Sequence, residues 1–319
     1  MCKVIASKAN TQTGNFGSNL DTLAQLPTDG NKANLKKRAR SKFYSNRIVG
    51  PLLYINSPLH KQYNRAYHCN HTLIQHGKKI TGRYCNSRIC NICNRIRTAK
   101  FMNGYGEPLK ALGAMEFTTL TIPNCKADEL KATISQMCIN FSNILRVIRE
   151  RRKIKISGIR KIEVTYNPKA DTYHPHLHIM IDKAQGDELI KEWLQRYPKA
   201  DRKGQDTRPV TKGSFNELFK YSTKVLVKGE KNSFNIYVNP LDCIMRALDK
   251  RRTFQTFGKI KKVSEDVEEL QAVEVEDIES SEVVKTWEYN EFSADWFSIS
   301  DGEALTGYEP PDIEFTVYL

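Results

Sequence analysis

The stretch KIEVTYNPKADTYHPHLHIMI, residues 161–181, is the part of the sequence that decides the fold. Residues 161–166 are rich in β-branched and aromatic side chains, which favour a strand. Residues 167–171 supply Asn, Pro and Asp, which are typical of a turn, and residues 174–181 form a second strand-like run. The stretch therefore predicts a β-hairpin, and a turn centred between Lys169 and Ala170 places Glu163 opposite His176.

Three histidines, His174, His176 and His178, alternate along the second predicted strand. Side chains two residues apart on a strand lie on the same face, so these imidazoles can share one cation. Together with Glu163 they suit an octahedral ion with open positions, Mn²⁺ or Mg²⁺. His174 is expected either to ligate the ion or to contact one of its ligands. The alternative is a set of surface or core histidines that bind no metal.

The surrounding sequence predicts further strands and helices. Residues 117–122 read as a strand bounded by Pro123-Asn124, and apolar residues at intervals of three and four predict a helix over 127–150. Further helices are expected at 187–197, 214–228 and 240–250. This pattern predicts an α+β domain, an antiparallel sheet with packed helices. The sequence contains no phosphate-binding loop of the Gly-x-x-x-x-Gly-Lys-Ser/Thr type, so no ATP-driven helicase is expected in it.

The predicted helix over 214–228 has an apolar face and a polar one. Its polar stripe carries Glu217, Tyr221, Lys224 and Lys228. A tyrosine in these surroundings can act as a nucleophile, with Lys224 stabilising negative charge and Glu217 handling a proton. The alternative is a solvated tyrosine among surface charges.

Four of the eight cysteines, Cys69, Cys85, Cys90 and Cys93, fall within 25 residues of one another. In a reducing compartment such a cluster favours metal over disulfides, and the spacing predicts one structural Zn²⁺ held by all four thiolates. His68 or His71 could replace Cys69 as the fourth ligand, and a reduced cluster without metal is the remaining alternative.

Charge divides the chain into two opposite parts. The net charge is +14, but residues 263–319 contain 17 Asp and Glu against one Lys, which leaves +30 for residues 1–262. A body this basic is typical of a nucleic-acid binder. No apolar run approaches the roughly 20 residues of a membrane helix, and no secretory signal opens the chain, so a cytoplasmic protein without a membrane partner is expected.

Composition also suggests four parts. We expect a disordered basic arm over 1–46, which ends in the run Lys36-Lys37-Arg38-Ala39-Arg40, and a Cys-rich zinc-binding module over 47–105. The α+β domain should then occupy 106–262, and an acidic C-terminal tail 263–319.

These segments together resemble the plasmid rolling-circle replication initiators of the HUH endonuclease superfamily, of the type with one catalytic tyrosine and an accompanying glutamate. The blocks that carry the resemblance, in chain order, are Cys85-Asn86-Ser87-Arg88-Ile89-Cys90-Asn91-Ile92-Cys93, Phe117-Thr118-Thr119-Leu120-Thr121-Ile122-Pro123-Asn124, His174-Pro175-His176-Leu177-His178-Ile179, Lys220-Tyr221-Ser222-Thr223-Lys224 and Ala247-Leu248-Asp249-Lys250-Arg251-Arg252 with Phe257-Gly258-Lys259. The resemblance covers about residues 67–262.

The resemblance implies an HUH-like nickase domain over 106–262 and an enzyme that cuts one strand of origin DNA. It implies that Tyr221 becomes linked to the 5′ phosphate, that His176 and His178 hold the ion and that Lys224 assists at the phosphate. It also points to Glu217 activating water for termination. The implied partners are a host helicase and a DNA polymerase, which extends the freed 3′ hydroxyl. A homodimer is a further expectation.

Two other classes of protein fit parts of this pattern. A rolling-circle transposase or a conjugative relaxase shares the metal and tyrosine chemistry, although such transposases often use two tyrosines and only Tyr221 lies in this segment. A zinc-containing DNA-binding regulator would carry its histidines for structure alone. A nicking assay on supercoiled plasmid separates the regulator from both enzymes.

Overall fold

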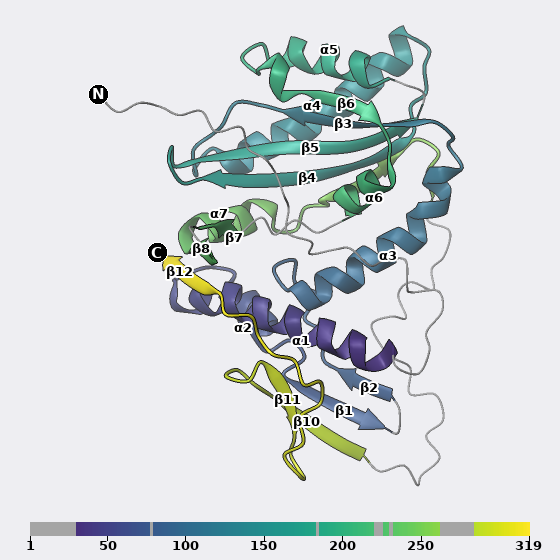
Figure 1. Ribbon diagram of the computed structural model, residues 1–319. Helices are drawn as coiled ribbons and strands as arrows, with labels where there is room; N and C mark the ends of the chain where they lie inside the picture. Colours follow the sequence, from purple (N-terminus) through teal and green to yellow (C-terminus); the bar gives the residue numbers. More distant parts are fainter. Residues whose placement is uncertain (1–29, 77–78, 183–184, 220–225, 230–231, 262–283) are drawn as a thin grey trace.

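The computed structural model of the chain describes residues 30–76, 79–182, 185–219, 226–229, 232–261 and 284–319 (Figure 1). They form an α+β structure with three sheets. The helices are α1 (Gly30–Val49), α2 (His60–Tyr67), α3 (Asn91–Lys110), α4 (Leu130–Arg151), α5 (Gly186–Arg196), α6 (Lys212–Phe219) and α7 (Val238–Leu248), with short 3-10 turns η1 (Gly50–Tyr54) and η2 (Arg202–Gly204).

The largest sheet contains the predicted hairpin. Its strand order is β6-β3-β5-β4-β9, and all neighbours run antiparallel. The strands are β3 (Met115–Thr121), β4 (Gly158–Asn167), β5 (Thr172–Asp182), β6 (Asp206–Pro209) and β9 (Phe254–Phe257). Glu163 pairs with His176 in the register of β4 and β5, so the predicted register of the hairpin is confirmed.

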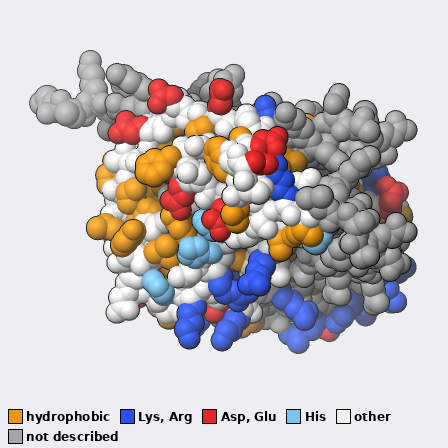
Figure 2. All heavy atoms as spheres, turned by 90° about the horizontal axis from the view of Figure 1, so that it is seen from below, with side chains coloured by type: hydrophobic (Ala, Val, Ile, Leu, Met, Phe, Trp, Pro, Cys, Tyr) orange, Lys and Arg blue, Asp and Glu red, His pale blue; other side chains and the backbone are white. Residues whose placement is uncertain are grey.

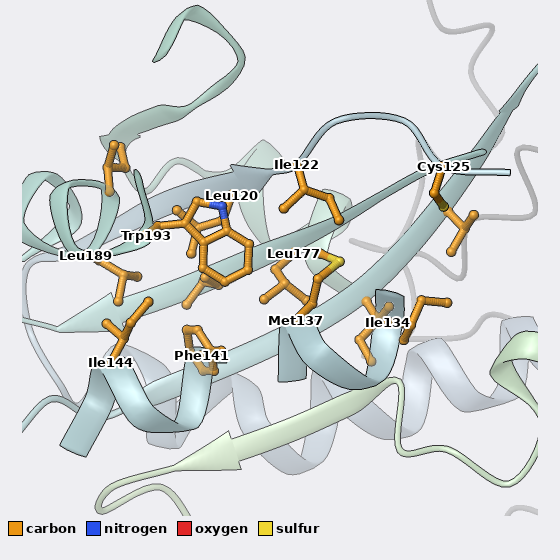
Figure 3. Packing of buried hydrophobic residues seen from close by; sticks show 14 of the residues in the cluster. Leu120, Ile122, Cys125, Ile134, Met137, Phe141, Ile144, Leu177, Leu189 and Trp193 are labelled. Atoms are coloured by element: carbon orange, nitrogen blue, oxygen red, sulfur yellow. The ribbon is translucent and has the colours of Figure 1, made fainter. Parts of the chain in front are cut away.

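Alternation along β5 divides the core between the two faces of this sheet. Leu177 and Ile179 belong to a buried cluster with α4 and α5, where Phe141 and Trp193 fill the space below the sheet (Figure 3). Met180, two residues beyond His178, belongs instead to a cluster with residues of α3 and α6. The even-numbered face of β5, which carries the histidines, is therefore the face toward α3 and α6.

Most of the predicted elements around the hairpin are confirmed. Strand β3 and helices α4, α5 and α7 agree with the predicted segments within about two residues at most ends. The single helix predicted over 214–228 is wrong at its far end: α6 ends at Phe219 in the described residues, and Leu226–Lys228 is strand β7. Strand β7 pairs with β8 (Ser233–Tyr237), so sheet pairing there takes precedence over helical periodicity.

The disordered arm predicted over 1–46 is wrong for residues 30–46, which belong to the 20-residue helix α1. Ala39, Lys42 and Phe43 on this helix are buried. Phe43 packs in one cluster with Leu73 of β1 and with Trp287 and Trp296. The basic run is thus ordered by apolar residues that are spaced among its charges. Residues 1–29 lie outside the described residues.

The acidic tail predicted over 263–319 is wrong for residues 284–318, because they contribute three strands to the fold. Strands β10 (Val284–Asn290) and β11 (Asp295–Ser298) form one sheet with β1 (Thr72–His76) and β2 (Lys79–Gly82), in the order β11-β10-β1-β2. Strand β12 (Glu314–Tyr318) pairs in parallel with β8. Residues from both ends of the chain therefore build the lower half of the molecule in Figure 1.

The boundary predicted between residues 105 and 106 falls inside a continuous helix. Helix α3 begins next to the cysteine cluster and carries Leu109, which is buried in the same cluster as Phe117 and Met180 of the large sheet. It therefore connects the N-terminal module to the sheet. No helix among the described residues is long and apolar enough to cross a membrane.

Candidate active site

Glu163, His176 and His178 come together on the face of the large sheet toward α3 and α6. One ligand atom from each residue lies within 4.8 Å of the others, and all three side chains are buried. Glu163 Oε2 is 3.4 Å from His178 Nε2, and Glu163 Oε1 is 3.9 Å from His176 Nε2. The arrangement follows from the β4–β5 register, which sets the carboxylate opposite the first imidazole and diagonal to the second.

The other ring nitrogen of each histidine is occupied. His176 Nδ1 lies 3.2 Å from the backbone carbonyl oxygen of His174, and His178 Nδ1 shares a 3.2 Å hydrogen bond with Thr119 Oγ1. Such contacts fix the ring and leave Nε2 to face the carboxylate, as in most protein metal sites. Burial lowers the pKa of His176 to about 4, so its imidazole is neutral near pH 7, which is the form that binds metal.

His174 takes a different position from the other two histidines. Its ring stacks on that of His176 at a centroid distance of 5.3 Å, but it is only half-buried and is not in the three-residue group. Burial lowers its pKa as well. Its backbone carbonyl, rather than its imidazole, is what orients His176.

Two neutral imidazoles and one carboxylate fit a divalent cation with open positions. Oxygen and imidazole ligands together suit Mn²⁺, and a hard ion such as Mg²⁺ would rely more on the carboxylate and on substrate oxygens. The donor set at Glu163, His176 and His178 is therefore compatible with the expected ion.

Lys161 is a member of this site that the sequence analysis missed. Its Nζ lies 3.2 Å from Glu163 Oε2 and donates a hydrogen bond of 3.2 Å to the backbone carbonyl of Glu217 on α6. Its side chain is only 4% exposed. A lysine two residues before Glu163 on the same strand face was the available signal. Lys161 thus connects the metal-ligating strand to the helix that precedes Tyr221.

Glu217 lies on α6 with a half-exposed carboxylate. Its Oε2 accepts a hydrogen bond of 2.8 Å from Arg208 Nη2 on β6. The Arg208 guanidinium lies over the ring of Phe117, 4.8 Å from its centroid, and that ring is 5.4 Å from His178. The alternative partner suggested for Glu217, a residue of its own helix, is thus replaced by an arginine from the sheet. Tyr221 and Lys224 lie outside the described residues.

The four predicted zinc ligands form a second group. The sulfur atoms of Cys69, Cys85, Cys90 and Cys93 lie within 4.8 Å of one another. Cys69 and Cys93 are 3.7 Å apart and Cys85 and Cys93 are 3.6 Å apart, sulfur to sulfur. Tetrahedral Zn²⁺ with Zn–S bonds of about 2.3 Å requires sulfur separations of roughly 3.8 Å. The geometry fits zinc, and it brings in Cys69 rather than His68 or His71.

The surroundings of the four sulfurs also favour bound metal. The backbone N–H of Cys85 donates to Cys69 Sγ at 3.4 Å, and the N–H of Ser87 donates to Cys85 Sγ at 3.4 Å. Cys90 immediately precedes α3, so the helix N-terminus favours thiolate nearby. Burial lowers the pKa of Lys42 to about 8, while nearby Cys69 and Cys90 act to raise it. Lys42 thus places a cationic group beside the cluster.

Comparison with known proteins agrees with the resemblance seen in the sequence. The sequence model of the family described as "Replication protein" matches residues 76–186, which run from the end of β1 to the start of α5. This segment contains three of the clustered cysteines and all three residues of the histidine site, but not Glu217 or Tyr221.

Individual relatives carry the same description. The chain is 32% identical over 104 residues to "Protein rep" of Streptococcus pneumoniae serotype 2, which covers 31% of this chain and 32% of that protein. It is 34% identical over 105 residues to a "Protein rep" of Staphylococcus aureus, covering 30% of this chain and 44% of that protein. A longer match, 24% identical over 263 residues, to "Protein rep" of Lactiplantibacillus plantarum covers 68% of this chain and 80% of the relative.

The resemblance to replication proteins is therefore confirmed, most strongly for the segment from β1 to β5. The chain spans less than half the length of the first two relatives. No solved structure matches the chain significantly.

Proposed function

We propose that this chain is a rolling-circle replication initiator of the HUH type, which nicks one strand of plasmid origin DNA in a metal-dependent reaction. The observation that carries the proposal is the buried group of Glu163, His176 and His178 on the sheet face toward α6. The similarity of residues 76–186 to replication proteins supports the same function. Origin DNA, a host helicase and a host polymerase would be its partners.

In the proposed reaction the hydroxyl of Tyr221 attacks the scissile phosphorus. A bond forms between the tyrosine oxygen and phosphorus, the bond to the 3′ oxygen breaks, and that oxygen leaves as a 3′ hydroxyl after taking up a proton. A divalent ion on Glu163, His176 and His178 would polarise the phosphate and offset its developing charge. Lys224 would place a further positive charge at the phosphate.

A test on supercoiled plasmid that carries the replicon's origin distinguishes this proposal from a DNA-binding regulator. The enzyme should convert supercoiled plasmid to open circles when Mn²⁺ or Mg²⁺ is present and should stop in EDTA. A protein that binds the plasmid but leaves its topology unchanged with every ion would be a regulator.

Glu217→Gln should separate the first cleavage from termination. A chain with one nucleophilic tyrosine needs water for its second cut, and a carboxylate can deprotonate that water whereas an amide cannot. The variant should still nick and still form the tyrosine adduct, yet accumulate multimeric single strands in a replication assay. Glu188→Gln, which alters a carboxylate paired with Arg152 on α5, is the matched control. Release of unit-length circles at the normal rate by Glu217→Gln would assign termination to another group.

Lys161→Met should slow nicking without weakening metal binding. The substitution removes the connection between Glu163 and α6, and small misplacements of reacting groups cost about 10- to 100-fold in rate. Affinity for Mn²⁺, measured by calorimetry, should be unchanged or higher, because a positive charge beside the ion is lost. Lys169→Met at the exposed turn of the same hairpin should change neither quantity. A normal nicking rate for Lys161→Met would show that the contact is dispensable.

A further inference from the structure

The N-terminal module is cationic without internal compensation. Residues 30–106 contain 16 Lys and Arg and no Asp or Glu. Among the described residues, Lys36, Lys37 and Arg47 form no ion pair with an acidic group, whereas Arg152, Arg196 and other cations of the large sheet and its helices do. Figure 2, which views the molecule from the module's end, shows Lys and Arg side chains gathered along one edge. Such a surface favours a polyanion.

Helix α1 arranges part of this charge along one face. Lys36, Arg40 and Arg47 are exposed, and their spacing of four and seven residues places them in one stripe about 16 Å long. Phe43 lies on the same face between the two arginines, and Arg47 lies over its ring at 5.2 Å. The stripe therefore combines cations with an aromatic ring.

A cavity of about 640 Å³ opens at the C-terminal end of this stripe. Its walls include Phe43, Arg47, Tyr54, Tyr67, Tyr289 and Phe315. Tyr54 is 88% exposed, so its ring is available to a ligand. The volume lies within the range of small-molecule sites, and the aromatic walls offer flat faces for stacking.

The cavity also has a polar edge. Glu291 Oε1 accepts hydrogen bonds from Tyr67 Oη at 2.5 Å and from Asn46 Nδ2 at 3.5 Å. Asn46 Oδ1 is buried and has no hydrogen-bond partner among the residues that the structure describes. An amide and a carboxylate at the edge of an aromatic slot match the donor and acceptor edge of a nucleobase.

We propose that this surface binds single-stranded DNA, with the cations of α1 on consecutive phosphates and one unstacked base in the aromatic cavity. The proposal rests on the proposed function, since a nickase exposes single-stranded DNA at its origin. Single-stranded rather than duplex DNA is the occupant because only an unstacked base can enter between the rings. The site is separate from the Glu163–His176–His178 group, so it would hold the strand beside the cleavage point.

The test measures binding of the full-length protein to a fluorescein-labelled dT12 oligonucleotide in EDTA, where no cleavage takes place. Tyr54→Ala should weaken binding about 5-fold or more, which is the loss expected for one base stacked on an aromatic side chain. Arg47→Ala should weaken binding and reduce its dependence on salt. The matched controls are Phe292→Ala, which removes a 96% exposed ring that does not line the cavity, and Lys131→Ala, which removes an exposed cation on α4.

A second measurement locates the base directly. Ultraviolet cross-linking of an oligonucleotide with 5-iodouracil, followed by mass spectrometry, should attach the base to a tyrosine of the cavity, Tyr54 first. Wild-type affinity of both Tyr54→Ala and Arg47→Ala, or cross-links only outside the module, would overturn the proposal. Both measurements are made without metal, so their outcome is independent of whether the protein nicks DNA.

Discussion

His176→Ala and His178→Ala should each abolish metal-dependent nicking, with a rate at least about 100-fold below that of the wild type. The structure brings only three ligand atoms together, so loss of one imidazole removes a third of the protein's donor set. Altering contacts that merely orient a ligand already costs about 10- to 100-fold in metal affinity or activity, and loss of a ligand should cost more. Calorimetry with Mn²⁺ should show the same order of loss.

His174→Ala is the matched control for these variants, because its imidazole lies on the same strand face but outside the ligand group. It should keep metal binding, since its backbone carbonyl still orients His176. Equal loss of Mn²⁺ affinity in all three variants would show that His174 is a ligand. Full nicking by His176→Ala in EDTA would contradict the metal site altogether.

Cys93→Ser should remove the proposed zinc and destabilise the N-terminal module. A structural Zn²⁺ site contributes on the order of 10–16 kcal/mol of apparent binding free energy at pH 7, which exceeds much of the stability of a domain. Cys93 lies 3.6–3.7 Å from two of the other sulfurs, so its loss leaves three thiolates around an incomplete site. The variant should lack zinc and unfold at much lower temperature.

Elemental analysis and thermal unfolding check this prediction. Cys138→Ser, at a half-buried cysteine of α4 outside the cluster, should retain zinc and unfold near the wild-type temperature. A wild-type protein purified under reducing conditions without chelator that contains no zinc would contradict the assignment.

Local sequence patterns predicted the large sheet well. The hairpin register depends on turn residues and strand alternation within 21 residues, and it placed Glu163 opposite His176 correctly. The cysteine spacing identified the four sulfurs that converge. These signals are local or depend on rare residue types, so they survive without knowledge of tertiary packing.

The lower half of the molecule could not be predicted, because its order depends on contacts between distant segments. The run around Lys42 reads as solvated charge, yet Lys42 is buried against the carbonyl of Tyr67 and the neighbouring cysteines. In the acidic segment, Trp287 and Trp296 are buried only because β10 pairs with β1, more than 200 residues earlier in the chain. Charge composition conceals such strands.

The role of Lys161 was missed for a related reason. A lysine on a strand is usually solvated, and only the position of α6 over the sheet makes Lys161 a bridge between Glu163 and Glu217. Its face was predictable from strand alternation, but its partner on α6 was not.

Mass spectrometry of the covalent protein–DNA product tests the central claim most directly. Wild-type protein incubated with a single-stranded origin oligonucleotide and Mn²⁺, then digested, should yield one peptide that carries a 5′-phosphate-linked nucleotide on Tyr221. Tyr221→Phe should bind the oligonucleotide equally well and yield no adduct, because phenylalanine lacks the attacking oxygen. An adduct that persists in Tyr221→Phe, or that maps to another residue in the wild type, would contradict the account.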